Sequence, residues 1–171
     1  RWCRYLGSAA GEPAPVISAT GTLFPVEVHW WRSPTVRKGQ RRDDERLENK
    51  VATTVVRALR ETEGDILVFL PGIGEIRRAI TATESVTEGA VDLFPLAGAL
   101  SLEEQDAALA PSRPGRRRIV FSTDIAESSL TVDGVRVVID SGIARAPRFD
   151  PRTGMTRLTT VNISQASAHQ R

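Results

Sequence analysis

Cysteine is almost absent from this sequence of 171 residues, which contains only Cys3. A single cysteine forms neither an internal disulfide nor a zinc site by itself, and this favours a reducing compartment. Long apolar runs are missing too, since none approaches the roughly 20 residues that a membrane-spanning helix needs. No apolar leader opens the sequence either. We therefore expect a cytoplasmic protein that does not insert into membranes.

The sequence also lacks the elements with which a chain hydrolyses nucleotides by itself. No glycine is followed by lysine, so the phosphate-holding loop G-x-x-x-x-G-K-[ST] is absent. The acidic run Asp43-Asp44-Glu45 follows no apolar strand, unlike the carboxylate that holds magnesium in such sites. Phosphoryl transfer needs the loop, its lysine and that carboxylate together. We expect no nucleotide hydrolysis by this chain unaided.

Positive and negative charges nearly balance, with 23 Lys and Arg against 21 Asp and Glu. The hydrophobic share of 40% and the charged share of 26% indicate an ordinary globular protein with one domain and one core. Arginine dominates the cations and its planar group suits phosphate. However, the run Arg116-Arg117-Arg118 is more typical of a solvated strand entrance. The charge therefore supports nucleic-acid binding only weakly.

Short apolar segments alternate with helical patterns, which predicts an α/β fold with a parallel sheet. The expected strands are residues 65–70, 91–96, 119–121 and 135–140, with a further candidate at Val26–Trp31. The expected helices are residues 43–62, 73–83 and 101–110. Ser101 and Glu104 form the S-x-x-E pattern of a capping box, which fixes the start of the last of these helices.

The connection from residue 122 to residue 134 concentrates small hydroxyl residues, carboxylates and a glycine between two apolar strands. Loops at the carboxyl ends of strands are where ligands bind in open α/β sheets. A plain strand-to-helix connection, with Thr123 or Asp124 as the helix cap, explains the same spacing. The spacing alone leaves both interpretations open.

This connection reads S-T-D-I-A-E-S-S-L-T-V-D-G and resembles motif V of DEAH-type helicases, S/A-T-N-I-A-E-T-S-L-T-I-D-G. Asp124 replaces the family's Asn, while Ser128 and Val132 are conservative changes. The likeness continues downstream and ends at Gln165–Arg171, which resembles the approach to motif VI, Q-R-A-G-R-A-G-R. The phrase P-R-F-D-P-R-T-G-M is most similar to the bacterial HrpB-type subgroup.

The resemblance also extends upstream. Residues 21–27 resemble the G-R-x-F-P-V-E entry into a second RecA-like domain, and residues 66–72 resemble motif IV, I-L-V-F-L-P-G. The triplet Ser18-Ala19-Thr20 imitates motif III, but no acidic strand precedes it. The resemblance implies that residues 1–20 are a linker from a first RecA-like domain. Residues 21–171 would then be the second RecA-like helicase domain, truncated within motif VI.

The implied fold is a RecA-like α/β domain with a mainly parallel sheet flanked by helices, plus a β-hairpin near residues 145–161. The implied function is that of the second motor domain of an ATP-dependent RNA helicase, which supplies half of an interdomain ATP site and part of an RNA groove. ATP with Mg²⁺ would be the cofactor, with the magnesium ligands in the first domain. RNA, single-stranded or a duplex with a single-stranded tail, would be the partner, along with the first domain and C-terminal domains in cis. The alternative is a catalytically silent RecA-like module that binds nucleic acid or a protein partner.

Three residues match positions that face RNA in the family. Gly72 would let a phosphate approach a helix start closely. Thr123 keeps the family's hydroxyl donor. Asp124 offers a carboxylate where the family's amide can donate to phosphate, so it either faces the phosphate or turns inward to cap the short helix after the strand.

Other residues match positions that face the nucleotide. Leu109 stands where some relatives place an aromatic ring against the adenine, and Thr131 and Asp133 match residues beside the nucleotide. Gln170 matches the motif VI glutamine near the terminal phosphate. Ser129 matches the serine that relays nucleotide state to the RNA groove. The resemblance implies no metal ligand and no complete catalytic set in this sequence.

Overall fold

A computed structural model describes residues 7, 12–17, 25–30, 46–128 and 132–171. The chain divides into two units, Arg1–Ser33 and Pro34–Arg171. In the first unit, residues 12–17 and 25–30 contain neither helix nor strand. The strand predicted at Val26–Trp31 is therefore wrong for residues 26–30, and Trp31 lies outside the described residues. Val26 and Trp30 are exposed, so alternation of polar and apolar residues was not enough to form a strand here.

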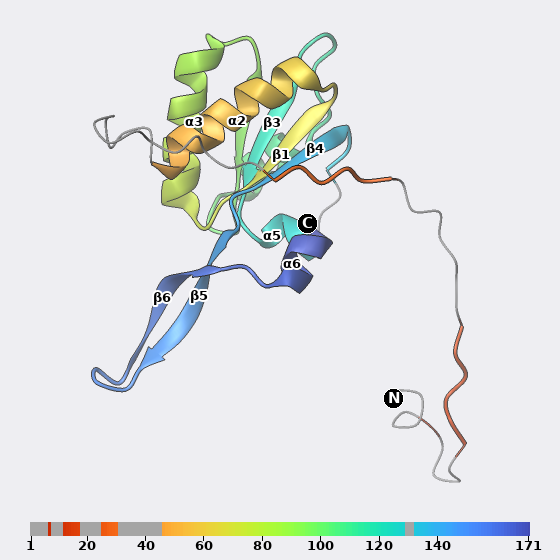
Figure 1. Cartoon of the computed structure of the whole chain (residues 1–171), viewed down its shortest axis with the longest axis vertical. Coiled ribbons are helices and arrows are strands. Elements are labelled where there is room, and N and C mark those ends of the chain that lie inside the picture. Colours follow the sequence, from red (N-terminus) through yellow and green to blue (C-terminus); the bar gives the residue numbers. More distant parts are fainter. Residues whose placement is uncertain (1–6, 8–11, 18–24, 31–45, 129–131) are drawn as a thin grey trace. The chain divides into compact units, whose positions relative to one another are not determined.

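A parallel sheet of four strands forms the centre of the second unit (Figure 1). The strands are β1 (Asp65–Phe69), β2 (Asp92–Leu96), β3 (Arg118–Ser122) and β4 (Val135–Asp140). Their order is β2-β3-β1-β4, with Ile66 of β1 in register with Ile119 and Val137. Both β1 and β3 are buried along their whole length, as their unbroken apolar runs predicted. The similar run of β4 does not give a buried strand: its residues alternate between half-buried and exposed, because β4 lies at the edge of the sheet.

Helices cover both faces of this sheet. The helices α2 (Leu47–Glu61) and α3 (Ile73–Thr87) pack on one face, against the side that presents Ile66, Val68 and Phe121. On the other face, α4 (Leu102–Leu109) and α5 (Ile125–Ser128) lie against Leu67, Phe69 and Val120. The predicted RecA-like α/β fold is confirmed. Among the described residues, no helix is long and apolar enough to cross a membrane.

Arg118 is buried, so the predicted solvated run of arginines is wrong at this position. Its side chain is 1% exposed and its Nη2 lies 3.1 Å from Oδ2 of Asp65, which also accepts a hydrogen bond from Ser112. The guanidinium further donates to the carbonyls of Ala108, Ala110 and Asp133. Arg118 therefore joins the end of α4, the start of β1 and the turn before β4.

The two neighbouring arginines are also engaged in the fold. Arg117 is half-buried and donates to the carbonyls at the end of α2, those of Leu59, Thr62 and Gly64. Arg116 pairs with Asp92 at 2.9 Å, on the surface. Arg117 thus bonds the start of β3 to the end of α2, and Arg116 bonds it to the start of β2.

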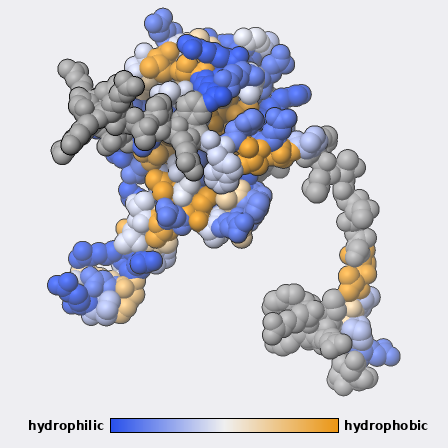
Figure 2. All heavy atoms as spheres, viewed as in Figure 1, coloured by the Kyte–Doolittle hydropathy of each residue, from blue (hydrophilic) through white to orange (hydrophobic). Residues whose placement is uncertain are grey.

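A β-hairpin follows the sheet, as predicted. Its strands β5 (Ile143–Asp150) and β6 (Met155–Asn162) pair in antiparallel register (Figure 1). Phe149 and Leu158 are about two-thirds exposed, at 66% and 65%. Arg148 and Arg157 stand directly opposite each other across the two strands. On the face shown in Figure 2 the end of the hairpin is mainly hydrophilic.

Candidate functional site

The carboxyl edge of the sheet gathers the ends of three strands and the residues that follow them. The amide of Leu70, after β1, donates to the carbonyl of Ser122 at 2.8 Å. The amide of Thr123 donates to the carbonyl of Leu96 at 3.1 Å, at the end of β2. Gly72 and Thr123 are both half-buried at this edge, so two of the three residues expected to face RNA lie at the ends of adjacent strands.

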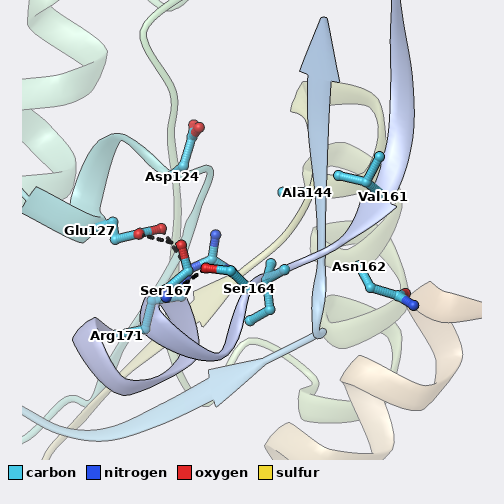
Figure 3. A pocket seen from close by; sticks show the side chains of 9 residues that line it. Asp124, Glu127, Ala144, Val161, Asn162, Ser164, Ser167 and Arg171 are labelled. Atoms are coloured by element: carbon cyan, nitrogen blue, oxygen red, sulfur yellow. Dashed lines mark hydrogen bonds and ion pairs between the residues drawn. The ribbon is translucent and has the colours of Figure 1, made fainter. Parts of the chain in front are cut away.

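Asp124 is exposed, and its side chain does not cap the short helix α5 in the way considered from the sequence. The amide of Glu127 donates to the main-chain carbonyl of Asp124 at 2.9 Å, and the amide of Ala126 donates to the carbonyl of Thr123 at 3.5 Å. Both amides are thus bonded by main-chain oxygens. Figure 3 shows the Asp124 carboxylate directed away from Glu127 and Ser167. The inward-capping alternative is therefore wrong, while contact with phosphate stays a prediction.

Glu127 forms the centre of a polar cluster between α5 and α6 (Gln165–Gln170) (Figure 3). The Ser167 hydroxyl donates to Glu127 Oε1 at 2.7 Å, and Arg171 Nε donates to Oε2 at 3.0 Å. The hydrogen bond from Ser167 lowers the pKa of Glu127; burial opposes this, and the bond and charge of Arg171 add to it. The carboxylate is therefore held in its charged form.

Arg171 connects the end of α6 to the sheet. Its side chain is only 3% exposed, and its Nη1 donates to Asp140 Oδ1 at 3.0 Å. Its guanidinium carbon lies 4.6 Å from the centroid of the Phe69 ring, within the range of a cation–π contact. Arg171 therefore bonds to α5 and β4 and stacks on β1.

A cavity of about 340 Å³ opens beside this cluster. Asp124 and Glu127 of the strand-to-helix connection line it together with Asn162 and Ser164, at the base of the hairpin. Carboxylate, amide and hydroxyl groups thus line part of the space next to Asp124, and Ala144, Val161 and Ile163 add apolar surface. The described part of the chain contains no group of three or more His, Cys, Asp or Glu side chains that could hold a metal ion.

Gly72 makes room for an ion pair that crosses from α3 to the hairpin. A Cβ atom at Gly72 would lie 3.2 Å from Arg145 Nε and 3.1 Å from Glu75 Oε2. Arg145 Nη2 lies 3.2 Å from Glu75 Oε1. Burial raises the pKa of Glu75, but its own amide, Arg145 and Arg78 outweigh that effect and lower the pKa. A side chain at position 72 would disturb this pair.

Residues 49–171 match the model of the helicase conserved C-terminal domain. The chain belongs to this family. It is 44% identical over 158 residues to the ATP-dependent RNA helicase HrpB of Escherichia coli K12, covering 92% of this chain and 18% of that protein. It is 39% identical over 158 residues to the ATP-dependent RNA helicase HrpA of the same organism, covering 92% of this chain and 12% of that protein.

The helicase domain also matches solved structures. The crystal structure of the E. coli DExH-box NTPase HrpB superposes with a TM-score of 0.69 at 47% identity, over 79% of this chain and 16% of that chain. The resemblance to DEAH-type, HrpB-like helicases is therefore confirmed, as is the assignment to a helicase motor domain. This chain spans at most 18% of the length of either curated relative named above.

The residues expected to face the nucleotide divide into two places in this helicase domain. Leu109 is half-buried and packs with the core face of Leu67 and Phe69, while Asp133 is exposed. Both lie at the amino edge of the sheet, beside Arg118. Gln170 instead donates to the Glu127 carbonyl at 3.4 Å, in the cluster between α5 and α6. Ser129 and Thr131 lie outside the described residues.

The sequence interpretation missed Glu127, Arg171, Glu75 and Arg145 as parts of this site. Glu127 matched motif V literally, which was the available signal, but the match assigned it no partner. Arg171 and Arg145 pair with carboxylates that are 44 and 70 positions away in the chain. Pairs at such separations depend on the sheet order, which local patterns do not contain.

Proposed function

We propose that this chain is the second motor domain of an ATP-dependent RNA helicase. Residues 1–20 would be the linker from the first RecA-like domain, and residues 21–171 the second domain, ending within motif VI. The observation that carries the proposal is the motif V segment, which begins at the last residue of β3 and continues from the carboxyl edge of the sheet into α5, next to α6. The names of the relatives, HrpB and HrpA, support the reaction class.

The carboxyl edge would form part of the RNA groove. The Thr123 hydroxyl would donate to a backbone phosphate, and the exposed Asp124 would lie alongside it. Gly72 lies at the start of α3 beside the ion pair of Arg145 and Glu75, so a phosphate there would meet a bare backbone and would compete with Glu75 for the guanidinium. The neighbouring cavity of about 340 Å³ would accept a polar part of the nucleotide chain. RNA, single-stranded or as the tail of a duplex, would be the partner.

The domain would contribute half of an ATP site between two motor domains. Leu109 would contact the adenine, Thr131 and Asp133 would lie beside the nucleotide, and Gln170 would lie near the terminal phosphate. The described residues fit this in part, because Leu109 and Asp133 offer an apolar and an acidic contact on one edge. ATP with Mg²⁺ would supply the energy of hydrolysis, with the metal ligands in the first domain.

Domain closure on ATP and opening after hydrolysis would shift the grip on RNA. In this scheme Ser129 would relay the nucleotide state to the groove. The first domain and C-terminal domains would act in cis. The rival function, a catalytically silent RecA-like module that binds nucleic acid or a protein, rests on the absence of a G-K-[ST] loop from this sequence. The two functions differ in whether the full-length protein hydrolyses ATP.

The test uses the full-length protein that carries this domain. We expect ATP hydrolysis that single-stranded RNA stimulates and separation of a tailed RNA duplex. Thr123→Ala should raise the RNA concentration for half-maximal stimulation by about tenfold, because a hydrogen bond to a charged phosphate is lost. Thr81→Ala, on the exposed side of α3, is the matched control. RNA binding without any hydrolysis would favour the silent module.

A further inference from the structure

Helix α6 has no buried residue, so apolar packing contributes little to its position. Among the described residues, the side-chain hydrogen bonds from α6 and Arg171 to the rest of the domain end on Glu127 or Asp140. Glu127 accepts most of them, through both carboxylate oxygens and its carbonyl. Glu127 is therefore the main polar attachment of α6 to α5, and Arg171 adds a second attachment to Asp140 and Phe69.

Glu127 is also rigidly connected to the residues expected to contact RNA. Its amide donates to the Asp124 carbonyl at 2.9 Å, so the turn that carries Thr123 and Asp124 is bonded to α5. Ile125, the first residue of α5, packs against the core face that includes Phe69. A displacement of Glu127 would therefore be transmitted to the turn at the end of β3.

The other end of this connection carries Gln170. The Gln170 side chain donates to the Glu127 carbonyl, and Arg171, the next residue, bonds to the Glu127 carboxylate. The Arg171 guanidinium is occupied by Glu127 and Asp140 and stacks on Phe69, so it acts as an anchor for α6. Glu127 thus lies between the residue expected near the terminal phosphate and the residues expected on RNA. Its main chain bonds to Gln170 and to the turn, and its carboxylate bonds to Ser167 and Arg171.

We propose that Glu127 is a positioning residue that couples α6 to the RNA-facing turn. When nucleotide binding displaces Gln170 and α6, the carboxylate of Glu127 transmits the movement to Thr123 and Asp124. This role rests on the proposed function of the domain. It adds to that function a specific link for the coupling, made of Ser167, Glu127 and Arg171, which the motif resemblance does not assign.

The experiment measures coupling in the full-length protein. RNA affinity is determined with and without a non-hydrolysable ATP analogue, and the ratio of the two affinities is the coupling. Glu127→Gln keeps the size of the side chain but removes its charge and one acceptor. We expect the ratio to move towards one by about fivefold or more, because the nucleotide state no longer reaches the RNA-facing turn. RNA-stimulated kcat should fall while KM for ATP changes little.

Two further variants test the link itself. Ser167→Ala removes one half-buried donor to the Glu127 carboxylate and should move the ratio in the same direction by a smaller factor. Glu127→Gln combined with Arg171→Gln should cost markedly less coupling than the product of the two single effects, because both variants break the same link. Glu61→Gln is the control, since it removes an exposed carboxylate paired with Arg57 at 2.7 Å on α2.

The outcomes separate the two proposals. A wild-type protein that shows RNA-stimulated hydrolysis and a ratio that Glu127→Gln leaves unchanged overturns the role of Glu127 alone. Equal losses of RNA affinity with and without the analogue, or multiplicative effects in the double variant, identify a merely structural residue and also overturn it. A wild-type protein without RNA-stimulated hydrolysis overturns the proposed function, and the coupling role with it.

Discussion

Arg118 and Arg171 are almost completely buried, and each lies against carboxylates of its own chain. An arginine that is paired in this way is not available to phosphate, whatever its position in the sequence. Burying an ion pair costs desolvation, which is recovered only when further hydrogen bonds satisfy both partners. Arg118 meets this condition through three main-chain carbonyls. The arginine content of this domain therefore overstates its capacity to bind RNA.

Replacement of Arg118 should destabilise the domain strongly. Arg118→Met leaves the buried Asp65 carboxylate without its cation, and breaking a buried pair in this way costs about 3–5 kcal/mol of unfolding free energy. Arg116→Met is the control, since its pair with Asp92 lies at the surface and should contribute less than about 1 kcal/mol. Urea denaturation of both variants gives the two values. If both variants lose a similar amount of unfolding free energy, burial of the Arg118–Asp65 pair does not determine its contribution to stability.

Asp124 should weaken RNA binding through its charge. The exposed carboxylate cannot donate to a phosphate and repels it by about 1 kcal/mol near a protein surface. Asp124→Asn should therefore tighten binding to single-stranded RNA several-fold at low salt, and the gain should shrink as salt screens the charge. RNA titration of the full-length protein at two salt concentrations measures this.

A matched control for Asp124→Asn is Glu84→Gln, which makes the same change of charge on the exposed side of α3. Its affinity for RNA should change less than that of Asp124→Asn. If wild-type and Asp124→Asn proteins bind equally at low salt, Asp124 does not face the phosphate.

The ends of individual helices are set by neighbouring residues that cap the helix or leave its conformation. The amide of Glu104 donates to the Ser101 hydroxyl at 3.3 Å, while the amide of Ser101 donates to the Glu104 carboxylate at 2.9 Å. This reciprocal capping box starts α4 as the sequence predicted. Helix α3 ends after Thr87, because the next two residues, Glu88 and Gly89, adopt the left-handed conformation with φ of 50° and 75°.

Removal of the α4 cap should cost a predictable amount of stability. Ser101→Ala leaves the Glu104 amide without its acceptor, and such a change costs about 1 kcal/mol. Ser85→Ala is the contrasting control, because its hydroxyl bonds back to the Ala82 carbonyl within α3, where alanine is the better helix former. Amide hydrogen exchange in α4 and urea denaturation would detect the difference. Equal effects would mean that the box does not stabilise α4.

The elements that could be predicted from the sequence are those that local pattern determines. The buried runs of β1 and β3 and the S-x-x-E pattern each depend on neighbours in the chain. The hairpin came from the family resemblance, and it was confirmed as well. The end of α3 was placed four residues too early, because the apolar pattern weakens before the αL residue Glu88. The strand predicted at residues 26–30 was wrong because local alternation does not specify a neighbouring strand to pair with.

Across the whole domain, the site residues that could be predicted are those set by local sequence, and the residues that were missed depend on contacts between distant segments. Thr123 and Gly72 were placed by motif and by the rule that strand ends gather at one edge of a parallel sheet. The pairs of Glu127 with Arg171 and of Glu75 with Arg145 come from the folded arrangement of distant segments. The first pair joins Arg171, after α6, to α5, and the second joins the hairpin to α3, so both ion pairs fix the relative positions of segments that are distant in the sequence.

The stability of the domain should fall in acid. The pKa values of Glu75, Glu104 and Glu127 are all lowered from the ordinary 4.5, so the folded state favours their charged forms. Their contribution is present above the unfolded value of 4.5 and is lost as the pH falls through the lowered folded values. Urea denaturation from about pH 6 to about pH 3 should show this decline.

A triple variant tests the source of the pH dependence. Replacement of Glu75, Glu104 and Glu127 by Gln should lower stability at neutral pH and flatten the decline below about pH 5, because the lost carboxylates can no longer bind protons. Glu84→Gln, which changes a carboxylate on the surface of α3, should leave the slope almost unchanged. A triple variant with the wild-type slope would show that other groups cause the acid sensitivity.

The isolated chain should fold but should not hydrolyse ATP, with or without RNA. Cooperative unfolding is expected because helices cover both faces of the sheet and an apolar cluster is buried on each face. Hydrolysis is not expected, because the sequence contains no G-x-x-x-x-G-K-[ST] loop to hold the phosphates and position them for attack. Phosphate release by the purified 171-residue chain should therefore equal that of a Thr123→Ala, Asp133→Ala double variant. Circular dichroism should first show that both proteins are folded. ATP turnover by the wild-type chain above that of the double variant would then mean that the chain carries a hydrolytic site of its own.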